Sequence, residues 1–246
     1  MTMIPVSHVV AAVRRRIVSR WRGYWVRRSG PHGPARIAAR LAAVGTPPYH
    51  GREFLSYLDP RGFIAPTASV SKSNLALGQH VFIGDYVIVS SGPDGGPVEF
   101  GDNVQLYGDT FIHTAAGGKL TIKSGTHIQP GAYIVACISE IRIGRNVEIA
   151  PRCALYSYNH GMAPGTPIMS QPLESKGPIT IGDYAWLGHG VIVLSGVHIG
   201  AGAVIGAGSV VAFDIPDNAI ATGNPAQVIK IRGRQRGSRD ILAATS

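Results

Sequence analysis

Aliphatic residues recur at every sixth position in the C-terminal third of the chain. Six of them follow one another without a gap: Ile181, Leu187, Val193, Ile199, Ile205 and Val211. Six residues advance an α-helix by about 600°, so these side chains would spiral around a helix instead of sharing one face. The period instead indicates a short strand followed by a tight turn. Glycine directly follows four of the six aliphatic residues, and we expect it to supply the backbone freedom of the turn.

Looser copies of the same period run upstream, with short insertions between them. They are Ile64/Val70, Leu77/Ile83/Val89, Phe100/Leu106/Ile112, Ile122/Ile128/Ile134 and Ile143/Ile149/Leu155. Three strand-and-turn units make a triangular coil of about 18 residues, and coils stacked at about 4.8 Å form a parallel β-helix. The pattern predicts an all-β solenoid of about seven coils over residues 63–216. A sandwich of ordinary short strands is the alternative, and the unbroken run of steps argues against it.

Three stretches of the repeat carry a family resemblance. They are Ile181-Gly-Asp-Tyr-Ala-Trp-Leu-Gly, Ile199-Gly-Ala-Gly-Ala-Val-Ile-Gly and Gly223-Asn-Pro-Ala. Over about residues 64–232 the chain resembles the hexapeptide-repeat acyltransferases, most closely the maltose/galactoside and polysaccharide sugar O-acetyltransferases. The resemblance implies a left-handed β-helix, acetyl-CoA as the acyl donor, no metal, and a homotrimer with sites between subunits. Left-handedness does not follow from the period, and it runs against the usual right-handed crossover rule.

The regular repeat breaks into a polar, proline-containing stretch over residues 156–178, which we predict to be an active-site loop. His160 lies near its start, beside the edge of a rigid coil. A neutral imidazole within about 3 Å of a sugar hydroxyl can take its proton during acyl transfer. The family's essential histidine lies in this loop, so the resemblance makes His160 the general base. Asn159 and Glu174 are candidates to orient its ring, and a backbone carbonyl is the alternative.

The resemblance also carries over the donor groove. Trp186 matches the family's aromatic residue at the thioester end, and Gly188, His189 and Ala207 match positions along the pantetheine arm. Backbone N–H groups at Gly188 or His189 are candidates for an oxyanion site. Lys230 matches a phosphate contact.

Two cationic contacts of the family are missing, because Gln227 is neutral and the family's Thr-Lys-Asp reads Ala212-Phe213-Asp214 here. Arg232, Arg234 or Arg236 are candidate replacements, and weaker donor binding is the alternative.

The acceptor side departs further from the family. Relatives that act on simple sugars hold them with Asn and Asp, whereas residues 132–139 here contain no carboxylate. Tyr133 and Gln129 are the polar candidates. The departure favours a larger acceptor, such as a sugar in a polysaccharide or in a lipid-linked precursor.

The two ends of the chain differ from its middle in charge. Residues 1–62 hold 11 basic and 2 acidic side chains, residues 63–226 hold 7 and 11, and residues 227–246 hold 5 and 1. The net charge of +9 therefore belongs to the ends and does not by itself indicate nucleic-acid binding. We expect no nucleic-acid partner.

Apolar residues at helical spacing predict a basic amphipathic helix over residues 5–28, and a short second helix is expected over about 35–44. The first helix either caps the solenoid, forms a contact between subunits of an oligomer, or lies on an anionic membrane. Residues 217–246 are predicted to form a C-terminal turn and basic tail.

Three further features bound the location and the chemistry. No uncharged apolar run reaches the roughly 18 residues of a membrane span, so we expect a cytoplasmic protein, with the inner membrane face as an option. Cys137 and Cys153 fit reduced thiols. A zinc enzyme on this fold needs three converging imidazoles, and the histidines at 113, 127, 160, 189 and 198 form no close pair within a turn.

The sequence favours an acetyl-CoA-dependent O-acetyltransferase that acetylates a sugar hydroxyl in bacterial polysaccharide or glycolipid biosynthesis. His160 acts as the base in a direct-transfer ternary complex. Two alternatives stay open. One is an antibiotic-inactivating O-acetyltransferase of the same fold, because Asn159-His160-Gly-Met162 resembles that branch too. The other is a non-catalytic β-helix scaffold or sugar-nucleotide-binding module.

Overall fold

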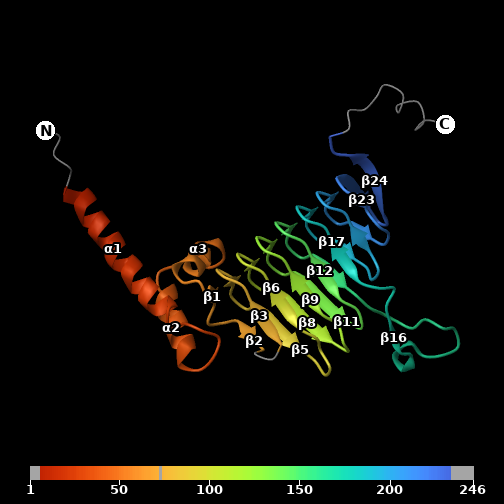
Figure 1. The fold of residues 1–246 in the computed structure, drawn as a ribbon, viewed down its shortest axis with the longest axis horizontal. Helices are drawn as coiled ribbons and strands as arrows, with labels where there is room; N and C mark the ends of the chain where they lie inside the picture. The colour runs from red at the N-terminus through yellow and green to blue at the C-terminus, as the bar shows by residue number, and fades with distance from the viewer. Residues whose placement is uncertain (1–5, 72–73, 234–246) are drawn as a thin grey trace.

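The computed structural model describes residues 6–71 and 74–233. In these residues, helices lie at one end of a stack of β-coils, and β23 (Ala219–Gly223) and β24 (Ala226–Ile231) lie at the other end (Figure 1). Position 5 of the predicted first helix and positions 234–246 of the predicted basic tail lie outside the described residues.

The coils are built from three sheets that run the length of the stack, and their strands are parallel except β24, which is antiparallel to β23. The nine-stranded sheet contains β1 (Phe63–Ile64), β4 (Phe82–Ile83), β7 (Gln105–Leu106), β10 (His127–Ile128), β13 (Glu148–Ile149), β18 (Trp186–Leu187), β21 (Val204–Ile205), β23 and β24. The seven-stranded sheet contains β2 (Ser69–Val70), β5 (Ile88–Ser91), β8 (Phe111–Ala115), β11 (Tyr133–Cys137), β14 (Ala154–Tyr156), β19 (Ile192–Val193) and β22 (Val210–Val211). The six-stranded sheet contains β3 (Leu75–Leu77), β6 (Val98–Phe100), β9 (Leu120–Ile122), β12 (Ile141–Ile143), β17 (Ile179–Ile181) and β20 (His198–Ile199). The predicted parallel β-helix is confirmed.

The register explains the six-residue period. Each strand pairs in parallel with the matching strand of the next coil, so that Ile128 lies beside Ile149 and Leu187 beside Ile205. The aliphatic residues of the repeat therefore stack inside the triangle. Apart from the partly buried Ile64 and Leu77, they are 0–6% exposed and form one continuous core.

The glycines after the aliphatic residues act differently from the expectation. The backbone freedom of the turn is used two residues later, at positions such as Tyr184 (φ 62°) and Gly208 (φ 71°). Gly182 is needed because the next coil lies so close: a Cβ there would be 2.4 Å from the backbone nitrogen of Ala201. Close approach between coils, rather than a left-handed backbone, therefore selects glycine at this position.

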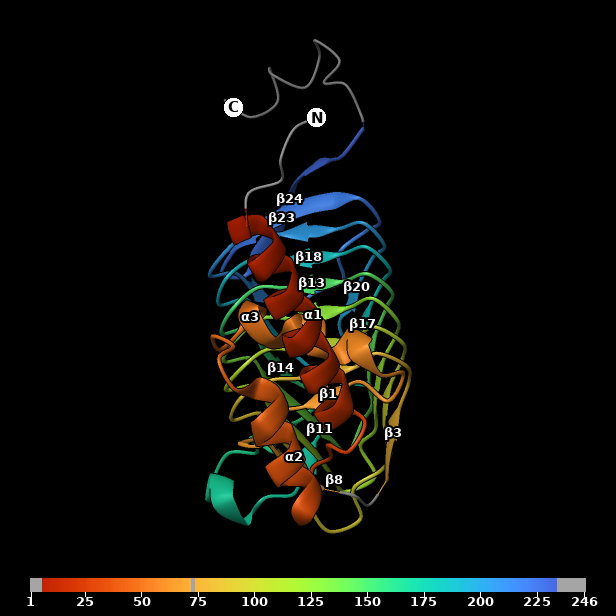
Figure 2. The ribbon, with the colours of Figure 1, turned by 90° about the vertical axis from the view of Figure 1, so that its left-hand side faces the viewer.

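The N-terminal region is helical, as predicted. Its elements are α1 (Val6–Val26), α2 (Pro34–Ala43), α3 (His50–Glu53) and the 3₁₀ helix η1 (Phe54–Leu58). Figure 2 looks onto this end of the molecule and shows α1 and α2 in front of the coil stack. No helix in the described part of the chain is long and apolar enough to cross a membrane.

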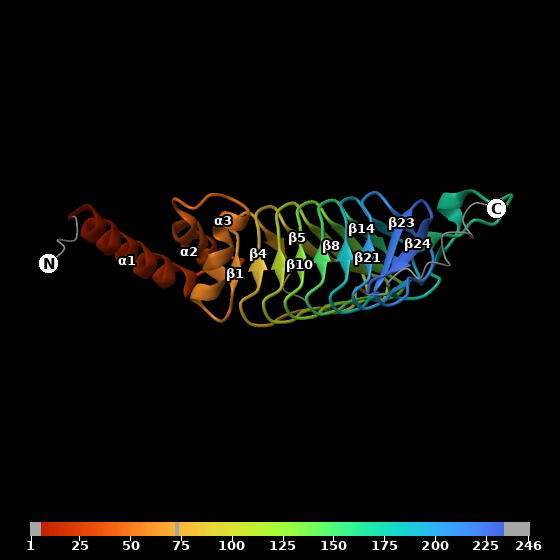
Figure 3. The same ribbon diagram turned by 90° about the horizontal axis from the view of Figure 1, so that it is seen from above.

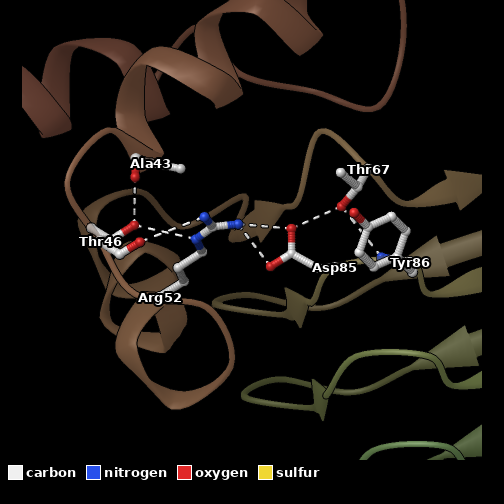
Figure 4. Close-up of polar contacts among 6 residues, drawn as sticks. All are labelled: Ala43, Thr46, Arg52, Thr67, Asp85 and Tyr86. Carbon is white, nitrogen blue, oxygen red and sulfur yellow. Dashed lines mark hydrogen bonds and ion pairs between the residues drawn. The ribbon is translucent and has the colours of Figure 1, made fainter.

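An ion pair joins the helical end to the first coils (Figure 4). Arg52 Nη1 donates to both carboxylate oxygens of Asp85 at 2.7 Å, and Arg52 Nε donates to Thr46 Oγ1 at 3.3 Å. Thr67 Oγ1 also donates to Asp85, at 2.8 Å. The guanidinium therefore ties the segment after α2 to a turn of the solenoid.

The larger insertions all lie at one corner, between the seven-stranded and six-stranded sheets. The longest of them, which we call the excursion, comprises residues 157–178 and takes up the predicted loop. It projects from the stack in Figures 1 and 3 and contains β15 (Asn159–His160), η2 (Ile168–Ser170) and β16 (Leu173–Glu174). The other coils continue past it without a change of register.

Candidate functional site

His160 lies in a short antiparallel strand pair at the root of the excursion. β15 pairs with β16, and Gly161 N donates to the carbonyl of Pro172 at 2.9 Å. Beyond the strands, Gln171 holds the loop together: its Nε2 donates to the carbonyl of Thr166 at 2.8 Å, and its Oε1 accepts from Ala163 N at 2.7 Å. The His160 side chain is exposed. The arrangement supports an imidazole on a pinned hairpin and leaves it open to a ligand.

Serines of the corner fix this hairpin to the coils. Asn159 Nδ2 donates to Ser195 Oγ at 2.9 Å, so Asn159 contacts the coil rather than the ring of His160. Ser175 Oγ donates to the carbonyl of Ser157 at 2.6 Å, and Ser157 itself is fully buried. The sequence interpretation missed Ser157, Ser175 and Ser195. The sequence does show that these serines lie at both ends of the excursion and in the next coil, and that spacing could have identified them.

The register of the hairpin separates Glu174 from His160. Glu174 pairs with Asn159, whereas His160 pairs with Leu173. Residues opposite each other share a face and neighbours along a strand alternate, so Glu174 and His160 belong to opposite faces of the hairpin. This geometry disfavours Glu174 as the group that orients His160.

The nine-stranded sheet carries a row of outward-facing residues that passes through Trp186. Trp186 pairs with Glu148 on one side and with Val204 on the other, and Val204 pairs with Ile220, which pairs with Lys230. Three strand spacings of about 4.8 Å put about 14 Å between the ends of this row, Trp186 and Lys230. The indole is 51% exposed. An elongated ligand along this row would meet an aromatic ring first and a cation last.

Gly188, His189 and Ala207 lie at the adjoining corner, between the nine-stranded and seven-stranded sheets. A Cβ on Gly188 would be 2.7 Å from the backbone nitrogen of Ala207, so the two turns are in close contact. The N–H of Gly188 donates to the carbonyl of Ile205 at 2.8 Å within the coil ladder, which argues against it as an oxyanion donor. Ala212 directly follows β22, at the corner on the other side of the seven-stranded sheet.

A polar cluster continues the row beyond Trp186 toward the helices. His127 Nδ1 lies 3.5 Å from Glu148 Oε2, and the hydrogen bond to Glu148 raises the pKa of His127 above its ordinary value of 6.5. Gln129 Nε2 donates to Glu148 Oε1 at 2.8 Å. Next to this cluster, Tyr107 donates to Glu53 at 2.7 Å, and burial together with the carboxylate raises the pKa of Tyr107. The sequence interpretation identified only Gln129 in this cluster.

The structure separates the two acceptor candidates. Gln129 belongs to the polar cluster beside the nine-stranded sheet, whereas Tyr133 is a half-exposed residue of β11 in the seven-stranded sheet. The ring of Tyr133 lies 5.4 Å from that of Phe111, centroid to centroid. Tyr156, at the end of β14, pairs with Val135 in the same sheet. Tyr133 therefore shares a sheet with the root of the excursion, but it begins β11, two positions before the residue that pairs with Tyr156.

The last candidates are the arginines proposed to contact phosphates and the possible metal ligands. Arg232 Nη1 donates to the carbonyl of Gly202 at 2.7 Å, so this arginine is engaged within the coil stack. Arg234 and Arg236 lie outside the described residues. Across residues 6–71 and 74–233, no group of three or more His, Cys, Asp and Glu side chains could hold a metal ion.

Comparisons with known proteins agree with this architecture. The family described as "Bacterial transferase hexapeptide (six repeats)" matches residues 178–212. A Saccharomyces cerevisiae protein named as an acetyltransferase is 39% identical over 132 residues, which are 54% of this chain and 58% of the relative. WbbJ of Escherichia coli, whose name describes a lipopolysaccharide biosynthesis O-acetyl transferase, is 35% identical over 144 residues, 55% of this chain and 72% of the relative.

Among solved structures, a mutant of the N-acyltransferase AntD of Bacillus cereus, in complex with dTDP and coenzyme A, superposes with a TM-score of 0.53 at 23% identity. The superposition covers 69% of this chain and 86% of AntD. This likeness shows the fold, a left-handed parallel β-helix. With the sequence matches, it establishes that the chain belongs to the hexapeptide-repeat transferases.

Proposed function

We propose that the protein is an acetyl-CoA-dependent O-acetyltransferase that acetylates a sugar hydroxyl. His160 takes the hydroxyl proton as the oxygen attacks the thioester carbonyl, and the coenzyme A thiolate leaves and is protonated. The observation that supports this chemistry most directly is the exposed His160 on a hairpin pinned to the coil through Asn159 and Ser195. A backbone carbonyl orients its ring, in keeping with the register that turns Glu174 away.

The donor lies along the row from Trp186 to Lys230. The thioester end meets Trp186, the pantetheine arm follows the corner of Gly188, His189 and Ala207, and Lys230 contacts a phosphate. Gly190 and Gly208, at the same corner, have nothing of the described chain within 4 Å of the place a Cβ would take, which leaves room for a ligand to approach the backbone closely. Several relatives bear acetyltransferase names, and AntD was crystallised with coenzyme A, which motivates the choice of donor.

The complete site needs a second copy of the chain. His160 extends from the seven-stranded sheet, whereas Trp186 lies on the nine-stranded sheet, so one chain presents them on different sides. The excursion also exposes apolar side chains: Met162 is 74% exposed and Met169 86%. A homotrimer, in which the excursion of one subunit covers the Trp186 row of the next, buries these side chains and joins both halves.

The acceptor is a sugar of a polysaccharide or of a glycolipid precursor. Tyr133 and Phe111 offer ring faces on the seven-stranded sheet from which the excursion extends, and aromatic faces suit the apolar C–H surface of a sugar ring. WbbJ is named for lipopolysaccharide biosynthesis, and two relatives are named galactoside O-acetyltransferase, from Lactococcus lactis and Escherichia coli. Sugars are therefore the first acceptors to test in an activity assay.

A donor-turnover assay tests the proposal. Purified protein is given acetyl-CoA with a panel of free sugars, nucleotide sugars and oligosaccharide fragments, and thiol release is followed above the rate without acceptor. We expect acceptor-dependent thiol release and an acetyl ester on the sugar by mass spectrometry. Acetyl-CoA binding by calorimetry is measured in parallel. The absence of both turnover and acetyl-CoA binding would overturn the proposal in favour of a scaffold. Turnover with aminoglycoside or other antibiotic acceptors alone would favour an antibiotic-inactivating enzyme.

A further inference from the structure

Helix α1 carries an apolar stripe that stays largely exposed, although the Arg28 guanidinium lies 3.7 Å from the centroid of the Tyr24 ring. Ile17 is 63% exposed, Trp21 48% and Tyr24 45%. Their spacing of four and three residues places them on one face of the helix. Val26, on the opposite face, is buried against the helical core. The stripe is therefore a second apolar face of α1, and Trp21 within it also contacts α2.

Helix α2 continues this stripe. Its alanines Ala38, Ala39, Ala42 and Ala43 are buried, whereas Ile37 is 59% exposed and Val44, directly after the helix, 63%. Trp21 Nε1 donates to the carbonyl of Leu41 at 3.3 Å, which joins the two helices. We call the surface formed by Ile17, Trp21, Tyr24, Ile37 and Val44 the apolar platform.

Positive charge outweighs negative charge around the platform, although Asp109 of the coils lines the same cavity as Arg40 and Val44. Arg16, Arg20 and Arg40 are exposed on the same two helices. The two acidic residues of positions 1–62 are engaged elsewhere: Glu53 accepts from Tyr107 at 2.7 Å, and Asp59 pairs with Arg61 at 2.9 Å. An exposed apolar surface bordered by arginines is complementary to a partner whose surface is negatively charged and whose interior, directly below, is apolar.

The platform is also held rigidly at one end of the molecule. Figures 1 and 2 show α1 and α2 at the end of the stack opposite β24. The hydrogen bond from Arg36 Nε to the carbonyl of Pro66, at 3.0 Å, attaches α2 to the first coils, and the Arg52–Asp85 ion pair attaches α3. Arg61 donates to the carbonyl of Arg27, directly after α1. A surface that binds the platform would therefore orient the whole β-helix.

We propose that the apolar platform docks on the surface of an anionic lipid bilayer. Ile17, Trp21, Ile37 and Val44 enter the boundary between headgroups and acyl chains, and the arginines contact lipid phosphates. The contact is peripheral, because the described chain has no helix that could span the bilayer. Docking stands independently of the acetyl transfer proposed above, and it would hold the site at a fixed height over a lipid-linked acceptor.

Vesicle co-sedimentation of the full-length protein tests the proposal. The probes are vesicles of phosphatidylcholine alone and vesicles in which about a third of the lipid is phosphatidylglycerol. We expect binding to the anionic vesicles that is at least tenfold stronger than to the neutral ones. Raising the salt from 0.1 to 1 M should weaken it, because the Debye length falls from about 10 to about 3 Å.

Two variants separate the contributions of charge and apolar surface. Arg16→Gln with Arg20→Gln should weaken anionic binding at least tenfold, since each arginine near the surface contributes about fivefold. Ile17→Ser with Ile37→Ser and Val44→Ser should weaken it similarly while salt dependence remains. The matched controls lie on the β-helix: Lys119→Gln with Lys123→Gln for charge, and Tyr184→Ser with Phe213→Ser for exposed apolar area.

Three results would overturn the docking proposal. The first is equal binding to anionic and neutral vesicles, or no binding to either. The second is platform variants that bind as the controls do. The third is a platform variant that changes the oligomer mass in light scattering without changing vesicle binding, which would make the platform a contact between copies of the chain. Each result leaves the acetyl-transfer assay unaffected.

Discussion

The nine-stranded and seven-stranded sheets have the same geometry but carry different halves of the candidate site. Outward positions of the nine-stranded sheet form a regular row that includes Trp186 and Lys230 and never leaves the coil. The seven-stranded sheet ends at the corner that takes the insertions, and its coil runs on into the excursion with His160. The regular row suits a long ligand that lies along the stack. The excursion instead carries a single functional side chain, His160, away from the stack.

The difference shows how a repeat acquires chemistry without losing its core. The residues that flank the excursion return to the same register, so Ile143 and Ile181 pair as if the 22 residues of the excursion were absent. Backbone pairing of the coils is therefore independent of the hairpin, and the hairpin depends on the coils through Ser195. The two halves should respond to mutation in different ways.

The strongest test of the histidine side is His160→Ala. We expect turnover to fall at least about a hundredfold, about 3 kcal/mol of transition-state stabilisation, because loss of a general base typically costs 10²–10⁴-fold. The side chain is exposed, so thermal unfolding should be unchanged. His198→Ala is the matched control, an exposed histidine on the six-stranded sheet bonded to Thr180. Near-normal turnover of the His160 variant would remove the residue from the chemistry.

Mixing two impaired variants sharpens the comparison of the two sheets. Trp186→Ala should weaken donor use about tenfold through lost aromatic contact. If the halves belong to different subunits, co-expressed His160→Ala and Trp186→Ala chains form oligomers in which some sites carry both native residues. Activity should then exceed that of either variant alone. Verified mixed oligomers that show no gain would place both residues of each site in one chain.

The coil itself is most sensitive where glycine allows close approach. Gly182→Ala should lower the free energy of unfolding by about 2 kcal/mol, because its Cβ would sit 2.4 Å from Ala201 N and the coils must shift. Gly23→Ala in α1 is the control: its Cβ would meet Arg27 Nη1 at 3.6 Å, so helix propensity should raise stability by up to about 1 kcal/mol. Equal effects in urea denaturation would contradict the role of close approach.

The contrast between Gly182 and His160 also shows what sequence can predict. The six-residue period predicted the core and the stack, since each aliphatic position is fixed by one backbone geometry repeated along the chain. The same period located the excursion as its break. It could not predict that glycine serves contact between coils, that Gly188 N–H is already bonded, or that Glu174 opposes Asn159. These depend on distances between coils and on the register of one hairpin, which no spacing along the chain encodes.

Ser195 joins the coil to the hairpin, so we expect Ser195→Ala to have a smaller effect on both stability and turnover. Losing the hydroxyl removes the hydrogen bond from Asn159 Nδ2, which should cost about 1 kcal/mol of stability. As Ser195 acts by positioning His160, kcat should fall severalfold while KM for acetyl-CoA stays unchanged. Ser91→Ala is the control, because Ser91 bonds Thr114 at 3.0 Å at the same corner of an earlier coil. An equal loss of kcat in both variants would make the effect merely structural.

The smallest expected effect concerns the polar cluster beside Trp186. The pKa of His127 is raised by its hydrogen bond to Glu148, so the protonated pair stabilises the fold below about pH 6.5 and is lost as the pH rises through the folded pKa. Both side chains are about 40% exposed, so the contribution should be under about 1 kcal/mol.

Glu148→Gln removes the charge but keeps the shape, and Glu99→Gln, on the six-stranded sheet, is the control. Urea unfolding between pH 5.5 and 8.5 should show the wild type and Glu99→Gln losing more stability toward high pH than Glu148→Gln does. Identical pH dependence in all three proteins would mean that the row beside Trp186 carries no proton-linked contact. A difference would show that the nine-stranded face holds its polar groups in place without a ligand.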